Sequence, residues 1–86
     1  MTAKIHPDLV DHLIRLYCDW REECAEVAAA YDRFSRAEPG DRALAHAAYV
    51  AALDREEAAA RTYGYHVELI VTADAERRSR RPAGVR

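Results

Sequence analysis

The residues with the clearest chemical potential are a thiol and a carboxylate that occupy matching places in the two halves of the chain. Cys24 lies in an apolar repeat of the N-terminal half, and Glu56 lies in the equivalent repeat of the C-terminal half. A thiol facing a carboxylate inside a protein can support redox or metal chemistry. We favour a structural role, in which Cys24 is a small core residue and Glu56 accepts a hydrogen bond from Trp20, a tyrosine or Arg21.

The histidines do not follow a recognisable metal-binding motif. Di-iron bundles place a Glu three residues before an inward-facing His, and His12, His46 and His66 lack an acid at that position. Asp8 and His12 are four residues apart, so they share a helix face and could contribute to one metal site. His12 also lies opposite Glu68 when the two halves are aligned, and we favour a salt bridge between these two side chains.

Four tyrosines recur at helical spacing, at positions 17, 31, 49 and 63. They could line a slot for a ligand, but aromatic residues at this spacing more often form a core, and we expect core packing. The sequence contains no Ser–His–Asp set and no C-x-x-C motif. We therefore predict no enzymatic activity, no catalytic residue and no cofactor, and a metal or redox bundle is our least favoured alternative.

Basic residues are concentrated at the C-terminus. All 15 acidic residues precede position 77, whereas residues 77–86 contain arginine and no acid. Arg77, Arg78, Arg80 and Arg81 could contact nucleic-acid phosphates or an acidic partner. Because the rest of the surface is acidic and repels nucleic acid, we favour interaction of these arginines with a helix C-terminus or with a neighbouring acidic surface.

Acidic residues form a band in each half, with Asp19, Glu22, Glu23 and Glu26 in the first and residues 54–57 in the second. Such bands are usually solvated helix faces, although they could also dock a basic partner.

Apolar residues recur in steps of three and four, which predicts two long helices. Pro7 and Asp8 suit the start of the first helix, and Pro39-Gly40 ends it. The pattern predicts an all-α antiparallel two-helix hairpin, in which Phe34 faces His46 and Val10 faces Ile70. We expect the hairpin to span residues 7–78, with helices at about 7–37 and 42–78, a turn at 38–41, an N-terminal arm at 1–6 and a basic flexible tail at 79–86.

Sixteen residues form the predicted seam between these helices. They are Val10, Leu13, Tyr17, Trp20, Cys24, Val27, Tyr31 and Phe34 in the first helix, and His46, Tyr49, Leu53, Glu56, Ala60, Tyr63, Val67 and Ile70 in the second. Gly64 interrupts the second helix and costs about 1 kcal/mol relative to Ala. It either permits close approach of a neighbour, or marks a bend and a third helix from about Tyr65.

A lone hairpin has little interior, and apolar residues remain outside the predicted seam. They include Leu9, Ile14, Leu16, Leu44, Val50, Tyr65, Leu69 and Val71. Alanines at positions 47, 48, 51, 52, 58 and 59 provide smooth faces on which another helix can pack. We therefore expect a homodimer that forms a four-helix bundle, with a monomeric three-helix arrangement as the alternative.

The composition agrees with a small cytoplasmic protein of bacterial origin. The two cysteines are poorly spaced for a disulfide, no apolar run is long enough for a membrane span, and the N-terminus lacks the apolar region of a signal peptide. The bias toward Ala and Arg is typical of a GC-rich genome. The function that we predict is a non-enzymatic interaction or regulatory protein that acts as a homodimer on a protein partner. The alternative is a weak nucleic-acid-associated regulator that uses the arginine cluster.

Overall fold

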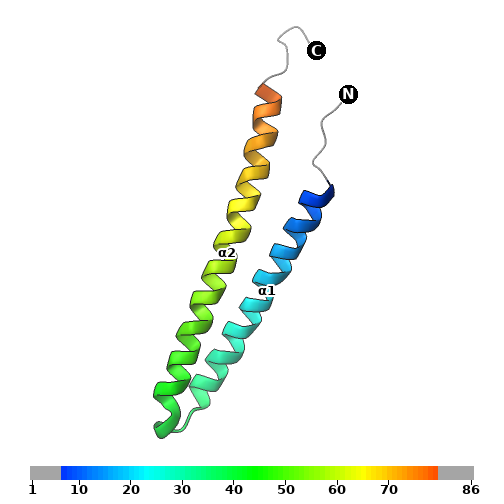
Figure 1. The fold of residues 1–86 in the computed structure, drawn as a ribbon. Helices are drawn as coiled ribbons and strands as arrows, with labels where there is room; N and C mark the ends of the chain where they lie inside the picture. Colours follow the sequence, from blue (N-terminus) through cyan, green and yellow to red (C-terminus); the bar gives the residue numbers. More distant parts are fainter. Residues whose placement is uncertain (1–6, 80–86) are drawn as a thin grey trace.

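The computed structural model describes residues 7–79 as an antiparallel helical hairpin, in agreement with the predicted fold class. Helix α1 spans Pro7–Arg36, the short 3₁₀ turn η1 spans Pro39–Asp41, and helix α2 spans Arg42–Ser79. Figure 1 shows the two helices side by side, joined at one end by the turn. The predicted arm at 1–6 and residues 80–86 of the predicted tail lie outside the described residues.

Local sequence explains where α1 begins and ends. Pro7 needs no backbone donor in the first turn, and Asp8 is favoured beside the positive end of the helix dipole. Arg33 and Arg36 occupy the last turn, where the dipole favours positive charge. The N–H of Ala37 then donates to the carbonyl of Phe34 at 3.2 Å, which tightens the end of the helix into a 3₁₀ turn.

The connection is short because proline stops one helix and prepares the next. Glu38 is extended, at φ −66° and ψ 155°, as expected for a residue that precedes proline. The N–H of Asp41 donates to the carbonyl of Glu38 at 2.8 Å, which closes the turn. Gly40 does not have a positive φ, so the backbone conformation of this turn does not require glycine.

Helix α2 continues through Gly64 without a break, which removes the alternative of a third helix starting at Tyr65. It contains 38 residues against 30 in α1. At 1.5 Å per residue the two helices measure about 57 and 45 Å. The C-terminal end of α2 therefore extends past the start of α1, as Figure 1 shows.

Heptad letters describe which residues lie between the helices. We assign position d to Leu13, Trp20, Val27 and Phe34 of α1 and to Tyr49, Glu56, Tyr63 and Ile70 of α2. Position g is then occupied by Leu16, Glu23, Ala30 and Ala37, and by Ala45, Ala52, Ala59 and His66. All sixteen of these residues are buried or half-buried, so these parts of the two rows lie between the helices. Nearer the helix ends, Leu9, Arg42 and Ala73 occupy the same heptad positions and are exposed.

The predicted seam combined position d with position a. Position a contains Val10, Tyr17, Cys24 and Tyr31 of α1 and His46, Leu53, Ala60 and Val67 of α2. Five of these eight residues are exposed, namely Val10, Tyr17, Tyr31, His46 and Leu53. Row a still takes part in the contact, because Tyr17 lies 5.5 Å from Tyr63, Tyr31 lies 5.4 Å from Tyr49 and Phe34 lies 5.2 Å from His46. Row d thus lies at the centre of the contact, with row g on one side of it and row a at its other edge.

Row g is buried as well because most of its residues are small. Ala30 and Ala52 are 2% and 1% exposed, and they are the fully buried hydrophobic residues of the described chain. Small side chains let two helix backbones approach closely, so the helices rotate toward the alanine side. Ala52 and Ala59 therefore pack inside the hairpin, whereas we had expected them to offer a smooth face to another helix.

Substitution of Ala52 tests this alanine contact. We expect Ala52→Leu to destabilise the hairpin by about 1–3 kcal/mol, because a larger side chain forces the helices apart. Ala51→Leu is the matched control, since Ala51 is exposed on the same helix, and it should change stability by less than about 0.5 kcal/mol. Urea unfolding followed by circular dichroism at fixed protein concentration measures both, and equal midpoints would contradict the predicted alanine contact.

Candidate functional site

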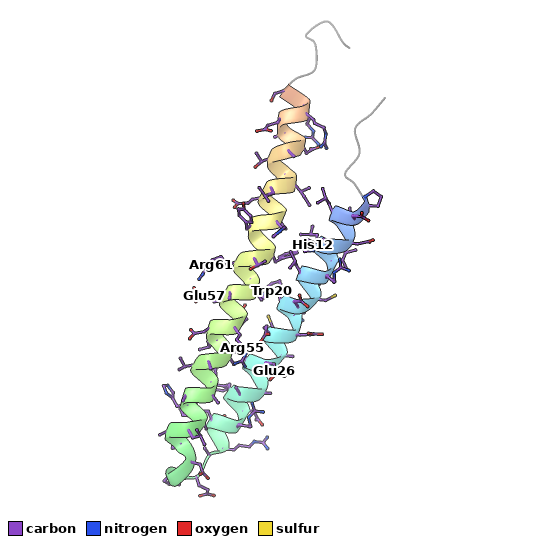
Figure 2. The ribbon with its side chains drawn as sticks, viewed as in Figure 1. His12, Trp20, Glu26, Arg55, Glu57 and Arg61 are labelled. Atoms are coloured by element: carbon purple, nitrogen blue, oxygen red, sulfur yellow. The ribbon has the colours of Figure 1, made fainter. Side chains whose placement is uncertain are left out.

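A polar cluster crosses the hairpin near its middle, where Glu56 meets Trp20 and Cys24. The indole Nε1 of Trp20 donates a hydrogen bond to Oε2 of Glu56 at 2.6 Å. The Sγ atom of Cys24 lies 4.0 Å from the same oxygen, at the outer limit for a thiol hydrogen bond. Figure 2 shows Trp20 in the space between the two helices. The structure therefore brings together the thiol and the carboxylate that the sequence paired.

The geometry of this cluster fits a structural role. Trp20 is held on two further sides, because its ring stacks on Tyr63 at 5.9 Å and meets the edge of Tyr17 at 5.9 Å. A neutral donor paired with a carboxylate at this distance forms a strong, charge-assisted hydrogen bond. The bond fixes one residue of α1 against one residue of α2, and so it defines how far the helices slide along each other.

Aromatic pairs flank the polar cluster on both sides. Tyr17 lies 5.5 Å from Tyr63 toward the open end, and Tyr31 lies 5.4 Å from Tyr49 toward the turn. Both distances are within the range of favourable aromatic contacts. A surface depression lies elsewhere, on α2 alone, and is lined by Ala58, Arg61, Thr62 and Tyr65. The four tyrosines thus contact one another in pairs and do not line this depression.

Two of the histidines form contacts that the sequence did not predict. His12 packs edge-on against His66 with ring centroids 5.1 Å apart, in place of the expected salt bridge with Glu68. Nδ1 of His66 lies 2.9 Å from the carbonyl oxygen of Thr62, one turn earlier in α2. His46 faces Phe34 at 5.2 Å, as the predicted pairing requires. Within residues 7–79, no three His, Cys, Asp or Glu side chains gather closely enough to hold a metal ion.

The described arginines of the C-terminal cluster are paired within their own helix. Nη2 of Arg77 lies 3.0 Å from one carboxylate oxygen of Asp74, and Nη2 of Arg78 lies 3.0 Å from the other. Arg80 and Arg81 lie outside the described residues. Asp74 is three residues before Arg77 and four before Arg78, so helical spacing alone could have indicated these ion pairs.

Charged side chains also connect the helices at two further points. The guanidinium of Arg55 lies 3.4 Å from Oε1 of Glu23, which joins α2 to α1. The guanidinium carbon of Arg42 lies 4.8 Å from the centroid of the Phe34 ring, a cation–π contact that covers the aromatic ring at the turn. Sequence reasoning did not identify either interaction.

The two broad sides of the hairpin differ in character. The g row of each helix contacts the other helix on one side: Glu23 reaches Arg55, and His66 meets His12. Rows a and e of both helices therefore lie together on the opposite side. We call this side the open face. Its a residues are given above, and its e residues are Ile14, Arg21, Ala28 and Ser35 of α1 and Val50, Glu57, Gly64 and Val71 of α2.

The open face carries most of the exposed apolar side chains of the described chain. Seven of the eleven large hydrophobic residues that are exposed in residues 7–79 belong to it, namely Val10, Ile14, Tyr17, Tyr31, Val50, Leu53 and Val71. Their exposed fractions range from 37% for Leu53 to 60% for Val71. Among the residues named for this face, Arg21 on α1 and Glu57 on α2 are charged. The same rows continue to Asp74 and Arg78 near the end of α2, and these two pair with each other at 3.0 Å. Exposed apolar side chains gathered on one side of a protein are a common feature of interaction surfaces.

The other broad side of α1 is charged. It presents Arg15, Asp19, Glu22, Glu26 and Arg33, all of which are exposed. This contrast between the two sides gives the hairpin one surface suited to burial and one suited to water.

Comparison with known proteins gives no further information about function, because no family model, curated protein or solved structure matches the chain. Neither of the two helices in residues 7–79 combines the length and the apolar character needed to cross a membrane.

Removing the carboxylate at position 56 tests the structural role of the polar cluster. Glu56→Ala leaves the N–H of Trp20 without its acceptor, and we expect a loss of about 1.5–3 kcal/mol in the free energy of unfolding. Glu56→Gln keeps an acceptor in place and should lose less. Glu22→Ala, an exposed position on the charged side of α1, is the control and should be close to neutral. Chemical unfolding measures all three, and a neutral Glu56→Ala would show that the hydrogen bond does not stabilise the hairpin.

Proposed function

We propose that the chain is a non-enzymatic interaction protein that acts as a homodimer, in which two hairpins form a four-helix bundle that binds a protein partner. The observation that carries this proposal is the open face. A helix in a bundle normally buries positions a and d together with e or g. In the hairpin, d and g lie between the helices, whereas seven large apolar residues of rows a and e remain exposed.

The small core of the single chain supports the same conclusion. The fully buried hydrophobic residues of residues 7–79 are two alanines, Ala30 and Ala52. Small domains with so little buried surface usually gain stability from oligomerisation, a metal or disulfides. Cys18 and Cys24 are both free. The exposed apolar side chains of the open face would become buried if two copies associated through this face.

The charged side of α1 remains outside in such a bundle and is available to a partner. Asp19, Glu22 and Glu26 are exposed there at helical spacings of three and four residues, so they form one acidic stripe. A partner with a basic surface is complementary to this stripe, and its association would weaken with salt.

Changing one residue of the open face tests the homodimer. We expect the wild-type chain to sediment at twice its monomer mass of 9.7 kDa at micromolar concentration. Ile14→Glu places a charge in the proposed interface and should give the monomer mass, whereas Leu44→Glu should remain dimeric, because Leu44 is 77% exposed and lies outside the open face. Sedimentation velocity distinguishes these species. A wild-type chain that remains at 9.7 kDa over the accessible concentration range would disprove the homodimer.

Affinity capture tests the protein partner. Wild-type bait should retain a partner at a fixed stoichiometry, and the partner should elute as ionic strength rises. Bait with Glu22→Lys and Glu26→Lys should lose it while keeping the dimer mass. A small molecule that is turned over by the purified chain, together with repeated failure to capture a protein, would argue for a different function.

A further inference from the structure

Gly64 is not explained by the hairpin itself. A Cβ atom built on Gly64 meets nothing within 4 Å, so an alanine fits there without any displacement. The helix is continuous through this position and its φ is not positive, so the backbone does not need glycine either. Glycine inside a helix costs about 1 kcal/mol relative to alanine. Gly64 lies on the open face, so a neighbouring molecule that packs on this face can explain why position 64 has no side chain.

The structure fixes which residues of α1 and α2 lie at the same height along the hairpin. His12 meets His66, and Glu23 meets Arg55. Because the helices are antiparallel, these two contacts place Ile14 level with Gly64. The pairs Tyr17–Tyr63 and Tyr31–Tyr49 place Ile14 level with His66, which is about 3 Å further along the helix. Gly64 is the e residue of α2 closest in height to Ile14 by both measures. By the first two contacts Arg21 is level with Glu57, and one heptad further toward the turn Ala28 is level with Val50.

Two copies can bring their open faces together in two ways. If the twofold axis runs parallel to the helices, both turns lie at the same end of the bundle, and α1 of each copy lies against α2 of the other. If the axis runs across the helices, the turns lie at opposite ends, and each helix lies against its own copy. The two arrangements bring different e residues together.

The first arrangement pairs residues that are complementary at three successive levels. Ile14 meets Gly64 of the second copy, so a large side chain lies over a position with none. Arg21 meets Glu57 of the second copy, so opposite charges come together. Ala28 meets Val50 of the second copy, again a small residue against a larger one. Large-on-small layers and opposite charges are the features that let helices interdigitate.

The second arrangement lacks this complementarity. Arg21 belongs to α1 and Glu57 to α2, so packing each helix against its own copy keeps the two charges apart. A charge that enters an apolar interface without a partner is costly. The charges of the open face therefore distinguish between the two arrangements.

We propose that the second copy packs with both turns at the same end of the bundle, that Gly64 receives Ile14 of the other copy, and that Arg21 pairs with Glu57 of the other copy. This inference rests on the proposed homodimer. Glu57 already has a partner in its own helix, since Arg61 lies 2.9 Å away, and Figure 2 shows both side chains pointing away from α1. Both are highly exposed, so this contact is weak and leaves the carboxylate able to accept a second guanidinium.

Charge reversal tests the arrangement. We expect Arg21→Glu alone and Glu57→Arg alone each to weaken self-association at least tenfold, because each homodimer then contains two like-charge contacts. An equimolar mixture of the two variants should form a heterodimer with close to wild-type affinity, since both contacts are again between opposite charges. Arg15→Glu, on the charged side of α1, is the control and should dimerise like the wild type.

The outcomes separate the arrangement from the homodimer. If the wild type dimerises but the mixture associates no more tightly than the single variants, the arrangement is wrong and the homodimer stands. If the wild type itself is monomeric, the proposed homodimer is wrong, and the arrangement of the two copies is wrong with it. Sedimentation equilibrium with one variant carrying a fluorescent label measures the heterodimer directly.

A steric test at Gly64 is independent of charge. Gly64→Leu should weaken dimerisation at least tenfold, because the new side chain occupies the place of Ile14 from the other copy. Its helix should be retained, since leucine is a better helix former than glycine, and circular dichroism checks this. Adding Ile14→Ala to the same chain should recover part of the lost affinity. Unchanged dimerisation by Gly64→Leu would overturn the proposed contact.

Discussion

The geometry of a two-helix hairpin governs the rest of this molecule, because two helices that touch each other can bury only adjacent rows of residues on each. In this chain the buried rows are d and g, and the g row is mostly alanine. Close approach along Ala30 and Ala52 draws both helices toward that side, so that row e and the exposed part of row a face outward. The apolar open face is thus a direct consequence of how the helices pack, and not a separate feature added to the fold.

An alanine-rich contact is close but not specific, because similar small side chains recur along α2 and allow the helices to slide. The hydrogen bond from Trp20 to Glu56 selects one register between the two helices. The carboxylate can reach the indole N–H at one register only, and a one-turn shift leaves both groups without a partner. The ion pair between Arg55 and Glu23 holds the same register from the g side. These polar contacts, together with the aromatic pairs Tyr17–Tyr63 and Tyr31–Tyr49, determine how far the two helices are displaced along each other.

The hairpin and the turn at Pro39 could be predicted from the sequence. Large apolar side chains at steps of three and four indicate helices strongly, and they also marked the d residues. The sequence did not indicate that row g is buried as well, because the alanines of that row carry almost no amphipathic signal. Pattern reasoning placed Tyr17 and Tyr31 in the seam because they are large. The tyrosines still contact Tyr63 and Tyr49, but from the edge of the contact, and they remain 44% and 54% exposed. The preference of His12 for His66 over Glu68 depends on the same rotation, which places His12 on the g side.

A thin core and an apolar open face together imply that folding and association are linked. A hairpin whose fully buried hydrophobic residues are two alanines has little stability to spare. Glycine at position 64 lowers it further, and a single chain selected only for its own stability would gain by replacing that residue with alanine. In the proposed bundle the loss is offset, because the missing side chain allows Ile14 of the other copy to pack closely. The stability of such a protein depends on its concentration, since the second copy supplies apolar contacts that the hairpin lacks.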